Sequence, residues 1–265
     1  MSGRIGRSRV RLIASAAICA ALYAIVNAIT SFVGTPFGIG EFRPGVIIPA
    51  FFALVSGPVP AAIGAGVGSF IGDMISLVPT GRSTFLLALA AGGTGNFIGF
   101  LTLGWIFEKL RNWKGFVVGT TAGLFLGNLV AAGVVVLILS LSISVMTGLL
   151  LFWFGTMFPF VIIFVPVLIR FMRPYASKLT PERAYPEIAE PNRIAVWSWS
   201  IIVALLVIGA LLVALLAESG FISQNGGTQA WEGLFVVSAI AVVIVGAFLP
   251  KIFSPSKAKA ASAKP

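Results

Sequence analysis

Residues 12–32 read LIASAAICAALYAIVNAITSF, and this apolar run decides the class of fold. A helix needs roughly 20 consecutive apolar residues to cross a hydrocarbon core of about 30 Å, which is the length of this run. Arginines precede it, as basic residues precede the apolar part of a secretory signal, but that part is only roughly 7 to 15 residues long. We therefore interpret residues 12–32 as a retained transmembrane helix.

Apolar runs continue through most of the 265 residues, of which 58% are hydrophobic and 10% charged, with a mean hydropathy of +1.05. A chain of this composition needs the lipid bilayer as its solvent. We predict an all-α polytopic membrane bundle with segments at about 12–33, 45–56, 59–77, 84–107, 115–140, 148–171, 195–217 and 232–250. The second segment is too short to cross upright. Because it meets the third at Gly57-Pro58, we expect the two to form a hairpin.

The pattern divides the chain into four regions. Residues 1–172 form a six-helix body, and residues 195–250 form an appendage of two additional C-terminal transmembrane helices. Between them, residues 173–194 are rich in proline and mixed in charge, which is typical of a solvated linker. The tail at 251–265, rich in Ala, Lys, Ser and Pro, is expected to be disordered.

Basic residues outnumber acidic ones, with 18 Lys and Arg against 8 Asp and Glu. Most lie in the alternate loops that share a side with the N-terminus, whereas Arg43 and Arg82 fall on the other side. Lys and Arg concentrate in cytoplasmic loops, so we expect both termini in the cytoplasm and the chain in the cell membrane. The same bias explains the net charge of +10 without a nucleic-acid partner.

Residues that most enzymes need are scarce. The chain has no histidine, which removes the commonest metal ligand and general base. Its one cysteine, Cys19, lies inside the first apolar run and has no second cysteine with which to form a disulfide in one chain. No G-x-x-x-x-G-K-[ST] loop occurs, so ATP hydrolysis would have to come from other subunits. We expect no enzymatic activity, no metal and no cofactor.

Small residues recur at every fourth position in three of the predicted helices, which places them on one face of each helix. The rows are Ala16, Ala20, Ala24 and Ala28; Gly64, Gly68 and Gly72; and Gly115, Gly119, Gly123 and Gly127. Such faces let helix backbones approach closely in lipid. For the glycine rows we expect packing within this chain. The alanine row fits either such packing or contact with a partner subunit.

Polar side chains at membrane depth are costly and therefore informative. The body has four of them, Asn27, Asp73, Asn96 and Asn128. Helical angles place Asp73 and Asn128 away from the glycine rows of their own helices, which predicts that both face the bundle interior. For each asparagine, a hydrogen bond between helices and contact with a ligand are both open.

Charged residues gather at the predicted outer side of the body. Together with two asparagines beneath them they form the predicted binding site: Glu41, Arg43, Asp73, Arg82, Asn96 and Asn128. A cluster of charges and hydrogen-bonding groups at one mouth of an apolar bundle fits a polar small molecule, and the loop at 34–44 supplies adaptable backbone. Alternatively, the two carboxylates merely pair with the arginines at the membrane interface.

Residues 41–58, EFRPGVIIPAFFALVSGP, and the glycine-rich run that ends at Asp73 resemble the substrate-binding S components of energy-coupling factor (ECF) vitamin importers, of the riboflavin and queuosine type. The order of features is similar too. A short second segment with a central proline leads through a Gly-Pro turn into a glycine-rich third helix that ends in Asp. A fourth helix with Gly95-Asn96 and a basic loop then precede a glycine-rich fifth helix. The resemblance covers residues 10–172, and the helices after about residue 195 depart from the family's six-helix body.

The resemblance implies a subunit that captures a vitamin or related micronutrient from outside. Delivery would depend on an ECF transmembrane coupling subunit, met by the alanine face of the first helix, and on two cytoplasmic ATPase subunits. A flavin is one ligand that the resemblance points to. Four aromatic side chains are candidates for stacking on its ring, although lipid-facing aromatics are commoner. They are Phe152, Trp153, Phe154 and Phe158.

Two other functions remain open at this point. A self-contained secondary transporter of a small polar solute would take up its substrate alone and depend on an ion gradient. A non-transport membrane assembly protein would bind no ligand.

Overall fold

A computed structural model describes residues 2–35 and 37–179 of the chain. All regular elements in this part are helices, as predicted. The two segments predicted at 195–217 and 232–250, the tail at 251–265 and most of the predicted linker lie outside the described residues.

The described helices span the region predicted for the body. They are α1 (Ser2–Thr30), the 3-10 turn η1 (Pro44–Val46), α2 (Ile47–Val55), α3 (Pro58–Thr80), α4 (Phe85–Leu87), the π-helical turn η2 (Ala88–Gly93), α5 (Thr94–Leu110), α6 (Trp113–Leu139) and α7 (Ile143–Leu179). Among them, five stretches are long and apolar enough to cross a membrane, and Pro44–Val55 is a shorter apolar helix. The chain is therefore a multi-pass membrane protein by the length and composition of its helices.

Local sequence signals set the helix ends. Gly57, with φ 102°, makes the turn between α2 and α3, and Pro58 begins α3 at the position where its missing N–H costs nothing. Gly81 ends α3 in the left-handed region at φ 63°. The side chain of Asn112 caps α6 by accepting a hydrogen bond from the Gly115 amide at 2.9 Å. Helix α7 continues to Leu179, beyond the predicted segment end near 171, because hydropathy marks where apolar residues stop rather than where a helix ends.

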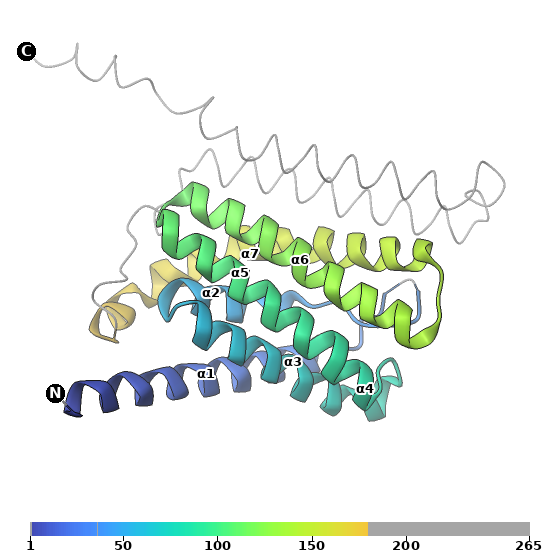
Figure 1. Cartoon of the computed structure of the whole chain (residues 1–265), viewed down its shortest axis with the longest axis horizontal. Coiled ribbons are helices and arrows are strands. Elements are labelled where there is room, and N and C mark those ends of the chain that lie inside the picture. Colours follow the sequence, from blue (N-terminus) through green and yellow to red (C-terminus); the bar gives the residue numbers. More distant parts are fainter. Residues whose placement is uncertain (1, 36, 180–265) are drawn as a thin grey trace, which may run out of the picture.

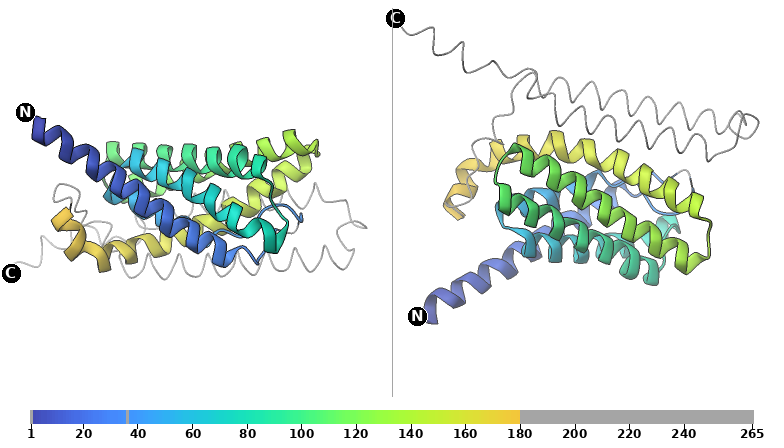
Figure 2. Two further views of the ribbon diagram at one scale, coloured as in Figure 1. Left: turned by 90° about the horizontal axis from the view of Figure 1, so that it is seen from below. Right: turned by 45° about the horizontal axis from the view of Figure 1, so that its top comes forward.

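The helices form one bundle in which α1 packs on α3, α3 on α5, α5 on α6, and α6 on α7 (Figure 1). The short α2 lies between them and contacts α1, α3, α5 and α7. The N-terminal part of α1 projects beyond the other helices in every view (Figures 1 and 2). The chain alternates between two ends of the bundle, so the connections at 31–43, 81–84 and 140–142 share one end. We call this the loop end.

Two seams in the bundle are lined by glycine. In the seam between α1 and α3, a Cβ added to Gly68 would lie 2.7 Å from the carbonyl oxygen of Ala20. In the seam between α5 and α6, a Cβ on Gly123 would lie 2.5 Å from the carbonyl oxygen of Gly99. Backbones this close leave no space for a side chain, so the prediction that the glycine rows pack within the chain is confirmed.

The alanine row on α1 packs in the first of these seams. Ala16, Ala20 and Ala24 are buried against the glycines of α3, and Ala28 is half-buried. The proposed use of this row as a partner interface was therefore wrong for its three buried members, because α3 already covers them. In the structure these alanines pack inside the body, which was the alternative interpretation of the row.

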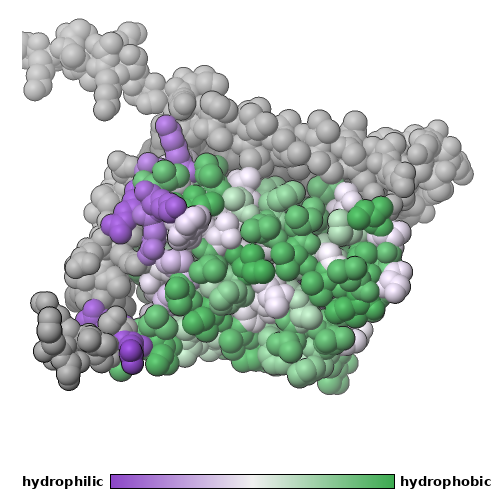
Figure 3. Space-filling model, viewed as in Figure 1, coloured by the Kyte–Doolittle hydropathy of each residue, from purple (hydrophilic) through white to green (hydrophobic). Residues whose placement is uncertain are grey.

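Exposed side chains divide the surface into an apolar belt and a basic end. Along the sides of the bundle large apolar residues are exposed, as lipid contact requires (Figure 3). Exposed basic residues lie at the end opposite the loop end, on α1, around the turn between α5 and α6, and on α7. They are Arg9, Arg11, Lys109, Arg111, Lys114 and Arg170.

Candidate functional site

The described residues of the connection between α1 and η1, 31–35 and 37–43, fold back over the loop end. The Phe42 amide donates to the Val33 carbonyl at 2.8 Å, and the Thr35 hydroxyl donates to the Ile39 carbonyl at 2.6 Å. The indole Nε1 of Trp153 on α7 donates to the Glu41 carbonyl at 3.1 Å. These bonds hold residues 31–35 and 37–43 in place over the bundle interior, and we call these residues the roof.

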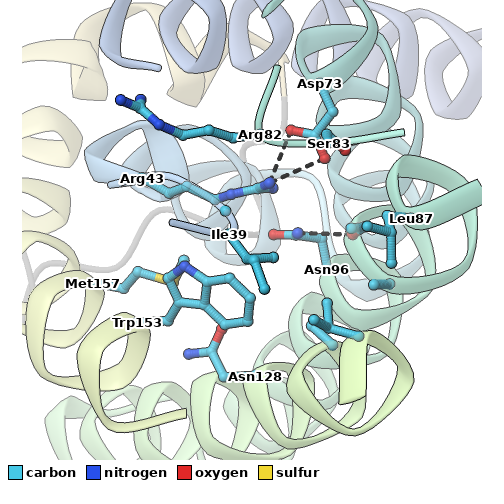
Figure 4. A pocket seen from close by; sticks show the side chains of 15 residues that line it. Ile39, Arg43, Asp73, Arg82, Ser83, Leu87, Asn96, Asn128, Trp153 and Met157 are labelled. Atoms are coloured by element: carbon cyan, nitrogen blue, oxygen red, sulfur yellow. Dashed lines mark hydrogen bonds and ion pairs between the residues drawn. The ribbon is translucent and has the colours of Figure 1, made fainter. Parts of the chain in front are cut away.

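A pocket lies beneath the roof (Figure 4). The pocket is small in this structure. The part open to the centre of a water molecule is only about 40 Å³, which holds a few waters at most. A larger ligand would therefore have to displace side chains or part of the roof.

An ion pair forms the polar wall of this pocket. Nη2 of Arg43, on the roof, lies 2.8 and 3.0 Å from the two carboxylate oxygens of Asp73 on α3. Nη1 of Arg43 donates to the Ser69 hydroxyl at 2.7 Å, one turn earlier on α3. Both charged side chains are more than nine-tenths buried. A pair so buried is retained only with good geometry and further hydrogen bonds, and this one has both.

Further hydrogen bonds connect the ion pair to α1 and α5. The Asn27 amide on α1 donates to Asp73 Oδ1 at 3.1 Å. The Asn96 amide on α5 donates to the Ser69 hydroxyl at 3.1 Å, and its oxygen accepts from the Tyr23 hydroxyl at 3.0 Å. The pocket wall is therefore one network that joins the roof to three helices. Asn27 and Asn96 make the bonds between helices that were one of their two predicted roles.

The opposite wall comes from α6 and α7. Asn128 on α6 lines the pocket, and its side-chain nitrogen is buried without a hydrogen-bond partner. Trp153 and Met157 on α7 line it with apolar surface. Trp153 is thus at the site, as the ring-stacking hypothesis needs. Phe154 and Phe158 stack on each other in the core, with ring centroids 5.5 Å apart, and do not line the pocket.

Glu41 does not line the pocket, contrary to the prediction. Its side chain is buried against the C-terminal end of α3, where Oε1 accepts from the Thr80 hydroxyl at 3.2 Å and Oε2 has no partner. Burial raises the pKa of the Glu41 carboxyl above its ordinary value, and the positive charge of Arg43 only partly opposes this shift. Glu41 thus serves the roof rather than the ligand site.

Arg82 lines the pocket, but its guanidinium forms hydrogen bonds with backbone carbonyls at the start of the roof. Nη1 donates to the carbonyl oxygens of Ser31 and Phe32, at 2.9 and 3.2 Å. In Figure 4 the guanidinium points away from Asp73. Arg82 therefore attaches the start of the roof to the connection between α3 and α4, and does not form the ion pair with a carboxylate that was the alternative for this cluster.

The structure brings five of the six predicted site residues to one pocket: Arg43, Asp73, Arg82, Asn96 and Asn128. Sequence reasoning missed the supporting residues Tyr23 and Ser69. Ser69 precedes Asp73 by one helical turn and therefore shares its helix face, so the spacing could have predicted that Ser69 lies at the site. Tyr23 gave no such signal, because its partner Asn96 is 73 positions away.

No family model, curated protein or solved structure matches the chain. Within the described residues, no group of three or more His, Cys, Asp or Glu side chains is placed to hold a metal ion.

Proposed function

We propose that this chain is the substrate-binding S component of an ECF-type importer, capturing a vitamin or related micronutrient and passing it on with the help of other subunits. The observation that carries the proposal is the pocket beneath the roof, with its buried Arg43–Asp73 pair and its place at one end of the bundle. The resemblance of residues 10–172 to that family supports the same function.

The bundle interior also contains a solid apolar core. Leu54, Leu103, Phe107 and Phe116 are fully buried in it. A ligand in the pocket therefore has no open path through the bundle in this conformation. This closed core fits a subunit that captures its ligand at one face and relies on partners for delivery.

The orientation we propose places the loop end outside the cell and the basic end in the cytoplasm. Lys109, Arg111 and Lys114 are exposed at the basic end, whereas both arginines of the loop end are engaged in bonds within the chain. The cytoplasmic side of membrane proteins is enriched in exposed Lys and Arg.

The coupling subunit needs a different face of α1 from the predicted alanine row. Ala17 and Ala21 are exposed one turn apart, flanked by the exposed Ile18 and Ile25. A second helix can approach closely over such small residues. We propose that this face, Ala17 and Ala21, meets the coupling subunit.

Purification and transport together test the proposal. The tagged full chain, solubilised from its own membranes, should bring down one further membrane subunit and two ATPases, and should carry a small molecule identifiable by mass spectrometry. In liposomes, uptake of that molecule should require all partners and ATP. Uptake by the chain alone, driven by an ion gradient, would instead establish a secondary transporter. Absence of any bound molecule would favour an assembly protein.

A further inference from the structure

The pocket's hydrogen-bonding groups are unevenly satisfied. Asp73 accepts from Arg43 with both oxygens, and Asn96 is bonded through both its oxygen and its nitrogen. Among the buried side-chain nitrogens and oxygens of the described residues, those of pocket-lining residues that lack a partner are Asn128 Nδ2 and Arg43 Nε. Both are donors.

Unsatisfied buried donors favour a particular partner. Leaving a buried N–H without an acceptor costs free energy that an acceptor on a ligand would recover. Asn128 on α6 and Arg43 on the roof both line the pocket, and in Figure 4 they lie on either side of the Trp153 ring. A molecule bound between them would meet a donor on each side.

The charges of the pocket favour the same kind of ligand. Its lining includes two cations, Arg43 and Arg82, against one anion, Asp73. Arg43 already compensates Asp73, and the Arg82 guanidinium is bonded to neutral carbonyl groups. The lining charge that has no countercharge in the lining is therefore the Arg82 guanidinium at the edge of the pocket, and its positive charge opposes a cationic ligand near it.

We propose that the pocket selects a ligand that is neutral or anionic at pH 7 and bears hydrogen-bond acceptors on two sides, which Asn128 Nδ2 and Arg43 Nε donate to, while its apolar surface packs on Trp153 and Met157. This inference rests on the proposed function and narrows its ligand class. A carbonyl, carboxylate or unprotonated ring nitrogen meets the requirement, whereas a quaternary or protonated amine at that position does not.

The first test is the identity of the small molecule carried by the purified parent chain. Mass spectrometry of the intact complex in detergent gives its mass, and fragmentation gives its structure. A neutral or anionic molecule with at least two acceptor groups is expected. A permanently cationic molecule would overturn this inference while leaving the importer function standing. A parent chain that carries no small molecule would overturn both.

The second test compares two substitutions on α6. Asn128→Leu removes the unpartnered donor, and retention of the parent's molecule should fall about tenfold or more, the cost of one lost hydrogen bond to a buried ligand. Thr120→Val is the matched control, because the Thr120 hydroxyl is also buried and unpartnered but does not line the pocket. Retention should stay at the parent level in Thr120→Val. Equal retention in parent and Asn128→Leu would overturn the inference, and the first test decides it if that variant does not fold.

Discussion

The guanidinium of Arg43 and the carboxylate of Asp73 meet at 2.8 Å across 30 positions of sequence, one on the roof and the other on α3. The pair therefore has two roles. It forms the polar wall of the pocket, and it attaches the roof to the helix bundle. Any ligand that competes for either charged group also loosens the roof, which couples occupancy of the site to the position of the roof.

We predict that stability and binding separate when this pair is removed in steps. Asp73→Asn leaves the buried Arg43 charge uncompensated and should destabilise the chain by roughly 3 to 5 kcal/mol. The double variant Arg43→Met, Asp73→Leu should recover much of that loss, yet retain little of the parent's ligand. Thermal unfolding in detergent and ligand retention measure the two effects. Lys114→Ala at the basic end should change neither, and a double variant that binds like the parent would remove the pair from the site.

Two glycines of α6, one inside the seam with α5 and one outside it, should respond differently to substitution by alanine. Gly123→Ala forces α5 and α6 apart, because its Cβ would lie 2.5 Å from the Gly99 carbonyl oxygen, so the unfolding temperature should fall. Gly133→Ala meets nothing within 4 Å and should be neutral or stabilising by up to about 1 kcal/mol, the helix propensity gain of alanine. Equal unfolding temperatures for the two variants would show that the seam tolerates added volume.

The exposed face of α1 predicts a defect confined to transport. Ala17→Trp with Ala21→Trp should leave folding and ligand retention intact but should block ATP-driven uptake in the complete complex, because close helix approach is lost. Ala20→Trp with Ala24→Trp, on the buried face, should instead destabilise the chain itself. Unimpaired uptake in the Ala17, Ala21 variant would place the partner contact elsewhere.

Glu41 predicts a dependence of stability on pH. Because the folded-state pKa of this carboxyl is raised, the folded chain binds more protons than the unfolded chain at pH values between the two pKa values. The contribution of Glu41 is therefore most favourable below its ordinary value of 4.5 and is lost as pH rises through the folded-state pKa. Glu41→Gln should remove this decline and raise the unfolding temperature at pH 7 relative to the parent. Parallel stability curves for the two proteins between pH 4 and pH 8 would contradict the assignment.

Single-cysteine labelling checks the proposed orientation. The native Cys19 is buried and should give little background. Ser142→Cys is exposed at the loop end and should react with an impermeant maleimide added to intact cells, whereas Lys109→Cys should react only after the membrane is opened. The reverse pattern would invert the topology. The related prediction that the loop holding Arg183 is cytoplasmic concerns a residue outside the described part.

Hydropathy and spacing were sufficient for the helices and most of the pocket residues. Apolar length predicted the five long apolar helices, and the cost of polar groups in lipid singled out Asp73, Asn96 and Asn128. Hydropathy and spacing did not predict which way each side chain points in the loops. Glu41 and Arg43 lie two positions apart and both side chains contact α3, but Arg43 reaches Asp73 in the pocket wall whereas Glu41 reaches Thr80 at the end of the helix.

The alanine row shows a second limit of sequence reasoning. Periodicity on α1 identified a small-residue face but not its neighbour, and Gly64, Gly68 and Gly72 on α3 carry the complementary face. The two small-residue rows pack on each other within the chain. The exposed pair Ala17 and Ala21 could therefore be identified only once the exposure of each side chain was known.

The glycine seams also determine which parts of the molecule can move. Helices α1, α3, α5 and α6 pack in sequence with close backbone contacts, so separating them would sacrifice many contacts at once, and we expect them to move as one unit. Helix α7 joins this unit through bulky side chains, such as the Phe125 and Phe154 rings at 6.2 Å, which can change rotamer. We therefore expect a ligand to enter the pocket between the roof and the adjoining face of α7. We expect entry rates to follow the mobility of those two elements and to be insensitive to bilayer thickness.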